Sequence, residues 1–91
     1  MDEKKNKSNL EKHGFELFEG AIVFEDEKRI EFPDIRFDYK ENRMITIGKY
    51  FDEIILSVCW TVRKNKIRLI SVRSASKKER RLYYGYSQND T

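Results

Sequence analysis

The stretch that decides the fold runs from Ile54 to Arg63 and reads IILSVCWTVR. Large apolar side chains stand at every second position from Ile54, and from Ser57 onward small or polar side chains, ending in an arginine, stand between them. Successive side chains of a β-strand point to opposite faces of its sheet, so this alternation predicts a strand with a core face and a small, polar face. The core face comprises Ile54, Leu56, Val58, Trp60 and Val62, and the polar face comprises Ser57, Cys59, Thr61 and Arg63.

A further strand is predicted on each side of this stretch along the chain. Arg43–Phe51 precedes it, with a turn at residues 52–53, and Ile67–Arg73 follows it after a turn at residues 64–65. Two-residue connections of this kind join antiparallel neighbours. The three strands are therefore expected to form a meander.

The alternation in the last strand assigns its side chains to faces. It places Ser71 and Arg73 on the same side as Ile67 and Leu69, and it places Arg68 on the opposite side. In a regular strand, Arg68 and Arg73 are therefore not expected to point into one site.

The segment before the meander predicts two helices and a short strand. The first helix begins at the N-cap Asp2 and ends at Gly14, and an amphipathic helix covers residues 16–24. A short strand over residues 28–33 ends at a proline. Residues 34–42 show no periodicity and are expected to form a loop.

The segment after the meander predicts a helix over about residues 76–86, followed by a tail, residues 87–91, that is expected to be disordered. The fold class is thus α+β, with two N-terminal helices, a twisted antiparallel sheet of about four strands and a C-terminal helix. The chain has 91 residues, of which 38% are hydrophobic. This supplies one hydrophobic core, so residues 1–91 are expected to form a single domain.

Composition excludes several classes of protein. No run approaches the ~18 apolar residues of a membrane span, and the N-terminus lacks the apolar segment of a signal peptide. The single Cys59 excludes an internal disulfide, a four-cysteine zinc site and a CxxC redox pair. We expect a cytoplasmic protein that uses no metal, no cofactor and no membrane partner.

The two halves of the chain carry opposite net charges. Residues 1–41 hold 8 Lys or Arg against 12 Asp or Glu, which gives −4, whereas residues 42–91 hold 11 against 4, which gives +7. A polyanion is expected to dock on the basic half, with the acidic half facing away from it.

Short motifs follow one another in a fixed order along the chain: NLEKHG at residues 9–14, FED at 24–26, RMITIG at 43–48, WTVR at 60–63, IRLISVRSA at 67–75, and Glu79, Arg80 and Tyr83. The ordered set covers about residues 2–84 and resembles the BrnT toxins. The resemblance implies a RelE-like α+β fold and a ribonuclease of a type II toxin–antitoxin system. It also implies a BrnA-like antitoxin whose ribbon–helix–helix binds DNA, so that the toxin itself meets DNA only indirectly.

RNA cleavage without a metal requires a base that takes the 2′-OH proton, a cation that stabilises the phosphorane and an acid that protonates the leaving 5′-oxygen. Arg73 is the first candidate for the cation, because a planar guanidinium contacts two phosphate oxygens and because Arg73 stands just before a helix N-terminus. The alternative is an ordinary ion pair with a surface carboxylate. Arg63 and Arg43 are candidate substrate clamps, or else solvated arginines at turns.

Glu79 has two interpretations. Ser76 and Glu79 have the spacing of a capping box, which would account for both without catalysis. In the functional interpretation Glu79 accepts a proton or orients Arg73, and it joins the arginines as a catalytic candidate.

The candidate RNA-binding residues are Ser71, Lys77, Arg80 and Tyr83. Ser71 binds phosphate or simply completes a strand, and the basic run of Lys77 and Arg80 tracks phosphate or forms a solvated helix face. Tyr83 stacks on a base or donates a proton, or else packs against the sheet. His13 is the only histidine. We expect it to stabilise the C-terminal end of the first helix by interacting with the helix dipole, rather than to act as a base.

Two other functions stay open at this point. One is a RelE- or ParE-like fold that acts by protein–protein contact, and the other is an RNA-binding module without nuclease activity. The first assay to separate them from a nuclease is incubation with RNA in EDTA.

Overall fold

The structure is a computed structural model that describes residues 3–35 and 41–88. It contains two α-helices, one 3-10 helix (η1) and four strands, in the order α1 Glu3–His13, η1 Leu17–Glu25, β1 Ile30–Pro33, β2 Arg43–Lys49, β3 Ile55–Arg63, β4 Lys66–Ser74 and α2 Lys77–Gln88. The predicted α+β class is confirmed. The second predicted helix is of the 3-10 type. Most of the predicted loop and the last three residues of the predicted tail lie outside the described residues.

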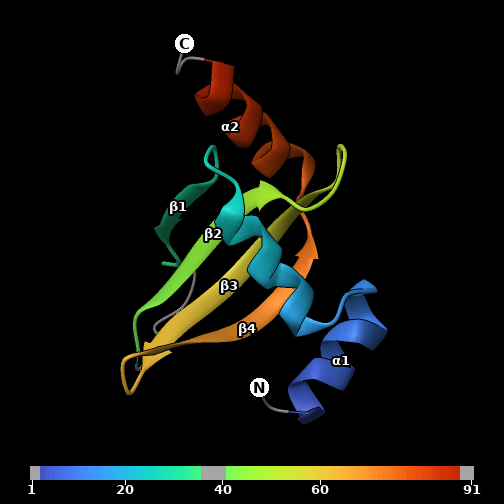
Figure 1. Ribbon diagram of the computed structural model, residues 1–91, viewed down its shortest axis with the longest axis vertical. Coiled ribbons are helices and arrows are strands. Elements are labelled where there is room, and N and C mark those ends of the chain that lie inside the picture. The colour runs from blue at the N-terminus through green and yellow to red at the C-terminus, as the bar shows by residue number, and fades with distance from the viewer. Residues whose placement is uncertain (1–2, 36–40, 89–91) are drawn as a thin grey trace.

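The four strands form one antiparallel sheet in the order β1-β2-β3-β4. The sheet is twisted, with η1 and α1 in front of it and α2 at one end (Figure 1). The β3–β4 turn is Lys64-Asn65, and both residues have positive φ values, 51° and 63°. A two-residue turn of this kind matches the right-handed twist of the strands that it joins.

The register of β3 against β4 changes at one point. Cys59 pairs with Ser71, but the next residue, Trp60, pairs with Leu69, so Ile70 is an extra residue in β4. This is a β-bulge, which reverses the alternation of side chains on the strand that carries it.

The bulge corrects the predicted faces of β4. Leu69 and Val72 both belong to the core beneath η1, although three residues separate them. Arg73 pairs with Ser57 and Arg68 pairs with Thr61, and these two β3 residues share the opposite face. The prediction that Arg68 and Arg73 lie on opposite sides of the strand, and that Arg73 shares a side with Leu69, is therefore wrong.

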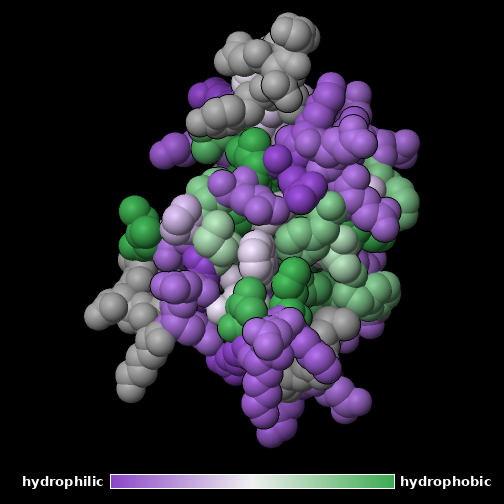
Figure 2. All heavy atoms as spheres, turned by 60° about the vertical axis from the view of Figure 1, so that its left-hand side comes forward, coloured by the Kyte–Doolittle hydropathy of each residue, from purple (hydrophilic) through white to green (hydrophobic). Residues whose placement is uncertain are grey.

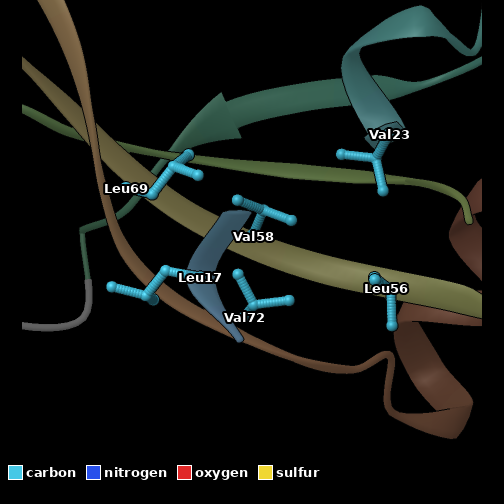
Figure 3. Close-up of a cluster of buried hydrophobic side chains, with 6 residues drawn as sticks. All are labelled: Leu17, Val23, Leu56, Val58, Leu69 and Val72. Atoms are coloured by element: carbon cyan, nitrogen blue, oxygen red, sulfur yellow. The ribbon is translucent and has the colours of Figure 1, made fainter. Parts of the chain in front are cut away.

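Each face of the sheet has its own core. The larger core joins η1 to β3 and β4, and Figure 3 shows its buried side chains: Leu17, Val23, Leu56, Val58, Leu69 and Val72. η1 lies so close to the sheet that a Cβ atom on Gly20 would stand 2.6 Å from Val72 Cγ2. Only glycine allows this approach.

The smaller core lies on the other face, beneath α2. It consists of Ile45, Ile47, Ile55 and Tyr83. Cys59 and Thr61 of the same face are also buried. The predicted polar face of β3 is therefore polar only in part, because α2 covers its apolar end.

α1 is held by polar contacts. Its large apolar residue, Leu10, is 43% exposed, whereas Asn9 is 5% exposed. The Asn9 amide nitrogen donates to the carbonyls of Phe15 and Val72, and its oxygen accepts from the Val72 N–H. The helix ends at Gly14, which has φ +79° and donates its N–H to the Leu10 carbonyl, as predicted for a glycine C-cap.

Candidate functional site

The best-defined polar cluster lies where β4 passes into α2. Arg73 Nη1 donates to Glu79 Oε1 at 2.7 Å and Arg73 Nη2 donates to Glu79 Oε2 at 3.0 Å, which makes a bidentate ion pair. The ends of the two side chains are largely enclosed, with 30% of Arg73 and 13% of Glu79 exposed. Paired contacts of this kind fix the plane of the guanidinium as well as its position.

Glu79 also caps α2, so the same side chain makes the capping contacts and holds Arg73. Its Oε1 accepts from the Ser76 N–H at 2.8 Å, and the Ser76 hydroxyl accepts from the Glu79 N–H at 3.2 Å. These reciprocal bonds are the predicted capping box. A fourth donor, the Ser57 hydroxyl of β3, lies 3.2 Å from Oε2.

The protonation state of Glu79 follows from these contacts. Burial opposes ionisation, but the hydrogen bonds from Arg73 and Ser76 outweigh it and lower the pKa of the Glu79 carboxyl below its ordinary value. The four donors fill the roughly four lone-pair directions that a carboxylate offers. In this arrangement Glu79 is an ionised acceptor with no free lone pair, so its geometry is that of a group that orients Arg73 and not of a proton acceptor.

Arg73 keeps one edge for another ligand. Nη1 donates to Glu79 and, at 3.2 Å, to the Ser74 carbonyl, and one hydrogen of Nη2 is taken by Glu79. The remaining donors, Nε–H and the second Nη2–H, lie along the same side of the guanidinium plane. That side is the edge that binds two oxygens of a phosphate.

The surface beside this ion pair is hollow. A depression of about 620 Å3 is lined by Phe32, Pro33, Asp34, Ile35, Ile45, Arg73, Ser76, Lys78, Glu79 and Leu82. Two of its apolar side chains are exposed, Ile35 by 88% and Leu82 by 39%. Figure 2, which turns the β1 side forward, shows hydrophobic side chains across the middle of this view, between hydrophilic groups above and below. A cationic centre and apolar surface therefore share one depression.

Arg43 and Arg63 form a separate group around Glu41. Arg63 Nε and Nη2 donate to the two oxygens of Glu41 at 3.0 Å each, and Arg43 Nε lies 3.4 Å from Glu41 Oε1. The hydrogen bonds from Arg63 hold the pKa of the Glu41 carboxyl below its usual range, and the same bonds raise the pKa of Arg63.

The structure brings Arg43 and Arg63 together, but not with Arg73. Arg43 pairs with Thr61 and Arg73 pairs with Ser57, four residues away along β3. At about 3.3 Å per residue this is roughly 13 Å along the strand. Arg68 lies on the same face, level with Arg43 because both pair with Thr61, and is the arginine that the sequence analysis left out.

Ser71 lies on the same face of the sheet as Arg73, as predicted, because it pairs with Cys59, two residues along β3 from Ser57. It also lines a small hollow of about 180 Å3 with Lys5, Lys12 and His13 of α1. His13 is the last residue of α1, where the sequence placed it. Ser71 therefore borders α1, whereas Lys77 and Arg80 line a different hollow.

Tyr83 belongs to the core. It is 3% exposed, and its hydroxyl donates to Asp26 Oδ2 at 2.5 Å. Burial and this hydrogen bond raise the pKa of the Tyr83 hydroxyl above its ordinary value. The packing interpretation of Tyr83 fits this position, whereas stacking on RNA would require the ring to leave the core.

Lys77 and Arg80 line a third depression, of about 700 Å3, with Arg81, Tyr84, Gly85 and Ala75. It lies on the flank of α2 that faces away from the Arg73–Glu79 pair, because residues 77, 80, 81 and 84 share one side of the helix. The neighbouring Tyr84, and not Tyr83, is therefore the aromatic side chain beside the basic run.

Two contacts of the site escaped the sequence analysis. Ser57 was placed on the right face, but a serine in a strand gives no sign that it bonds a glutamate 22 residues later. Arg73 was placed on the wrong side of β4 relative to Leu69 because the bulge at Ile70 has no marker such as glycine or proline.

Within residues 3–35 and 41–88, no three His, Cys, Asp or Glu side chains are grouped so that they could hold a metal ion. No helix in these same segments is long and apolar enough to cross a membrane.

Comparison with known proteins identifies a matching family and a similar crystal structure. The sequence model of a family described as "Ribonuclease toxin, BrnT, of type II toxin-antitoxin system" matches residues 1–79. The crystal structure of the Brucella abortus ribonuclease toxin BrnT is similar, with a TM-score of 0.63 and 26% identity, over 84% of this chain and 92% of that chain. No curated protein sequence matches the chain significantly.

Proposed function

The chain belongs to the BrnT family of type II ribonuclease toxins, and from this premise we propose that it is a metal-independent endoribonuclease. In this proposal it cleaves RNA in the cytoplasm, inhibits translation and is neutralised by a BrnA-like antitoxin. The resemblance seen in the ordered sequence motifs is confirmed by the family match and the similar crystal structure. The observation that carries the catalytic part is the geometry of Arg73.

Arg73 supplies the cation in this mechanism. Its Nε and Nη2 hydrogens contact two oxygens of the scissile phosphate. They stabilise the charge that develops when the 2′-oxygen, giving up its proton, attacks phosphorus and the bond from phosphorus to the 5′-oxygen breaks, with a proton going to that leaving oxygen. A donor that is already oriented does not have to reorganise during the reaction, which is why such groups lower barriers strongly. The Arg73–Glu79 pair supports this role because it fixes the guanidinium before substrate arrives.

Glu79 acts through Arg73 and is a positioning residue. It holds the opposite edge of the guanidinium, and its bonds to Ser76 and Ser57 anchor that hold to α2 and β3. Arg43 and Arg63 bind the substrate backbone farther along the same face, at a spacing that suits a neighbouring part of an RNA strand.

The antitoxin is proposed to occupy the depression beside Arg73. A ribonuclease of a toxin–antitoxin pair is silenced when its phosphate site is covered. The apolar side chains of Ile35 and Leu82 border the same depression and offer surface that a partner can bury. The partner segment is expected to carry an apolar side chain for this surface and a carboxylate for the free edge of Arg73. DNA is then contacted by the antitoxin and not by the toxin.

The test is cleavage of a 5′-labelled single-stranded RNA by the purified full chain in EDTA. We expect cleavage without added metal, products ending in a 2′,3′-cyclic phosphate, and a loss of about 10²–10³-fold in rate for Arg73→Ala. A preparation of Lys28→Gln, which removes an exposed charge from the turn between η1 and β1, serves as the control. Binding without cleavage would replace the nuclease with an RNA-binding module, and neither binding nor cleavage would favour action by protein–protein contact.

A further inference from the structure

We propose that the basic depression on the outer flank of α2 is a subsite for one nucleotide of single-stranded RNA, with the base against Tyr84 and its phosphate on Arg80 and Arg81. This inference rests on the proposed function, because it names a second contact for the same RNA. It concerns a surface that is separate from the Arg73–Glu79 depression and lies on the opposite flank of the helix.

The charges of this depression distinguish it from the rest of the basic half. Arg43, Arg63 and Arg73 each lie against a glutamate. Lys77, Arg80 and Arg81 line one hollow without a carboxylate among its lining residues, and within the described structure their side chains form no ion pair or hydrogen bond. Three like charges held close together repel one another, so a polyanion that enters the hollow gains the attraction of all three.

Tyr84 gives the depression a rigid aromatic surface. Its ring packs edge-on against Tyr83 at a centroid distance of 5.2 Å and an interplanar angle of 78°. Tyr83 is itself buried and bonded to Asp26, so the ring of Tyr84 has a firm support. A fixed ring beside cations is the arrangement that binds single-stranded nucleic acid, since bases stack on the ring and phosphates meet the charges. An acidic protein segment would bind through the positive charges alone and would not use the ring of Tyr84.

Gly85 keeps the depression open. A Cβ atom at this position would meet nothing within 4 Å, so no packing requires a glycine here. Glycine in a helix interior is destabilising relative to alanine. The missing side chain leaves room directly beside Tyr84. The total volume of about 700 Å3 lies within the usual range for small-ligand sites, which makes it large enough for a nucleotide.

The position of the depression fits a strand that continues from the reacting phosphate. Ala75, which lines it, stands two residues after Arg73 and directly follows β4. An RNA that passes the first turn of α2 therefore meets Arg73 on one flank and the basic depression on the other. The subsite would hold a nucleotide next to the cleaved bond.

The experiment measures binding of a fluorescein-labelled 12-nucleotide oligouridylate to the full chain by anisotropy, in EDTA and over a range of salt. Tyr84→Ala should weaken binding by about 5- to 150-fold, the range reported by alanine substitution for stacked bases, while Tyr84→Phe should stay within about twofold. The double substitution Arg80→Gln and Arg81→Gln removes the contact to one phosphate and should reduce the slope of log K against log salt by about 0.7. Lys28→Gln is the charge control.

Gly85→Leu separates a lost contact from a lost fold. Leucine favours the helix, so the melting temperature should stay the same or rise, yet its side chain fills the depression and should weaken binding at least fivefold. Binding of an oligonucleotide that lacks bases should not respond to Tyr84→Ala. Folded Gly85→Leu and Tyr84→Ala proteins that bind oligouridylate within twofold of the unchanged chain would overturn the inference.

The two proposals can fail independently, and the experiments tell their failures apart. If Arg73→Ala stops cleavage but the Tyr84 and Gly85 variants bind normally, the nuclease proposal stands and the subsite is wrong. If the chain binds oligouridylate through Tyr84 but cleaves no RNA, the subsite stands and the nuclease proposal is wrong.

Discussion

The side chain of Asn9 and the backbone of Val72 pair in the manner of two neighbouring strands. Asn9 donates to the Val72 carbonyl at 2.7 Å and accepts from the Val72 N–H at 2.9 Å. β4 is the last strand of the sheet, so these two Val72 groups would otherwise have no ladder partner. α1 thus closes the edge of β4 one residue before Arg73, and it does so with a single amide.

Asn9→Ala should destabilise the protein strongly. The substitution leaves the buried N–H and carbonyl of Val72 without partners, and each such group costs about 1–3 kcal/mol. A loss of about 2 kcal/mol lowers the melting temperature of a domain of this size by roughly 8–16 °C. Thermal unfolding followed by circular dichroism measures this shift.

Leu10→Ala is the matched control for Asn9→Ala. Leu10 is the large apolar residue of α1, but its partial exposure predicts a cost below about 1 kcal/mol. A larger loss for Leu10→Ala than for Asn9→Ala would mean that α1 is held by apolar packing after all.

The strands were predictable because their signals are local. Alternation along Ile54–Arg63 and the two-residue turns set the strand order, and the hairpin turn lies at Lys64-Asn65 as expected. The capping box of Ser76 and Glu79 was likewise readable from a spacing of three residues. Patterns of this kind are encoded within one turn or one strand.

The missed features depend on contacts between distant segments. Asn9 in a polar helix looks like a surface residue, and only the edge of β4, 63 residues away, makes it a buried one. In the sequence, Tyr83 is a candidate to contact RNA. The structure shows that its hydroxyl donates a hydrogen bond to Asp26, 57 residues earlier. The bulge at Ile70 gave no signal at all, and it alone moved Arg73 to the face of Arg68.

The Tyr83–Asp26 bond should make stability depend on pH. Burial of Asp26 opposes ionisation, but hydrogen bonds from Tyr83 and from the N–H groups of Lys49 and Lys28 outweigh it and lower the pKa of Asp26. A lowered folded-state pKa contributes stability that is complete above the unfolded value of about 4 and is lost as the pH falls below it.

Tyr83→Phe tests this dependence by urea unfolding at pH 6 and near pH 2.5. The substitution should cost about 1.5–3 kcal/mol at pH 6, where Tyr83 bonds a charged carboxylate, and distinctly less at the lower pH. Tyr84→Phe is the control, since the Tyr84 hydroxyl has no hydrogen bond in the described structure and its removal should cost little at either pH. Equal costs for Tyr83→Phe at both values would exclude a role for the Asp26 charge.

The antitoxin should lose affinity when the apolar border of the Arg73 depression is made polar. Ile35→Ser should weaken the complex about tenfold or more and leave RNA cleavage unchanged, because Ile35 is 88% exposed and supports no core. Val62→Ser changes an exposed apolar side chain at the far end of β3 and serves as the control. The measurement is titration calorimetry with the antitoxin. Equal effects of the two substitutions would place the antitoxin elsewhere.

Glu79 should matter to RNA cleavage through Arg73 and not through its own proton. In Glu79→Gln the side-chain oxygen can still accept the Ser76 N–H, so the capping box and the melting temperature should change little. The amide NH2 group faces Arg73 without accepting from it, which frees the guanidinium to move. We expect the rate to fall about 10- to 100-fold, less than for Arg73→Ala.

The pH profile of the variants separates the two roles of Glu79. If Glu79 only positions Arg73, the cleavage rate of Glu79→Gln should still fall at acidic pH with the same midpoint as in the unchanged chain. Only the maximal rate should be lower. Loss of that limb would instead make Glu79 the proton acceptor. Arg73→Lys provides the complementary test: an ammonium keeps the charge but cannot hold Glu79 with one edge and a phosphate with the other, so it should restore only part of the rate. Full activity in a folded Arg73→Ala protein would remove this pair from the active site.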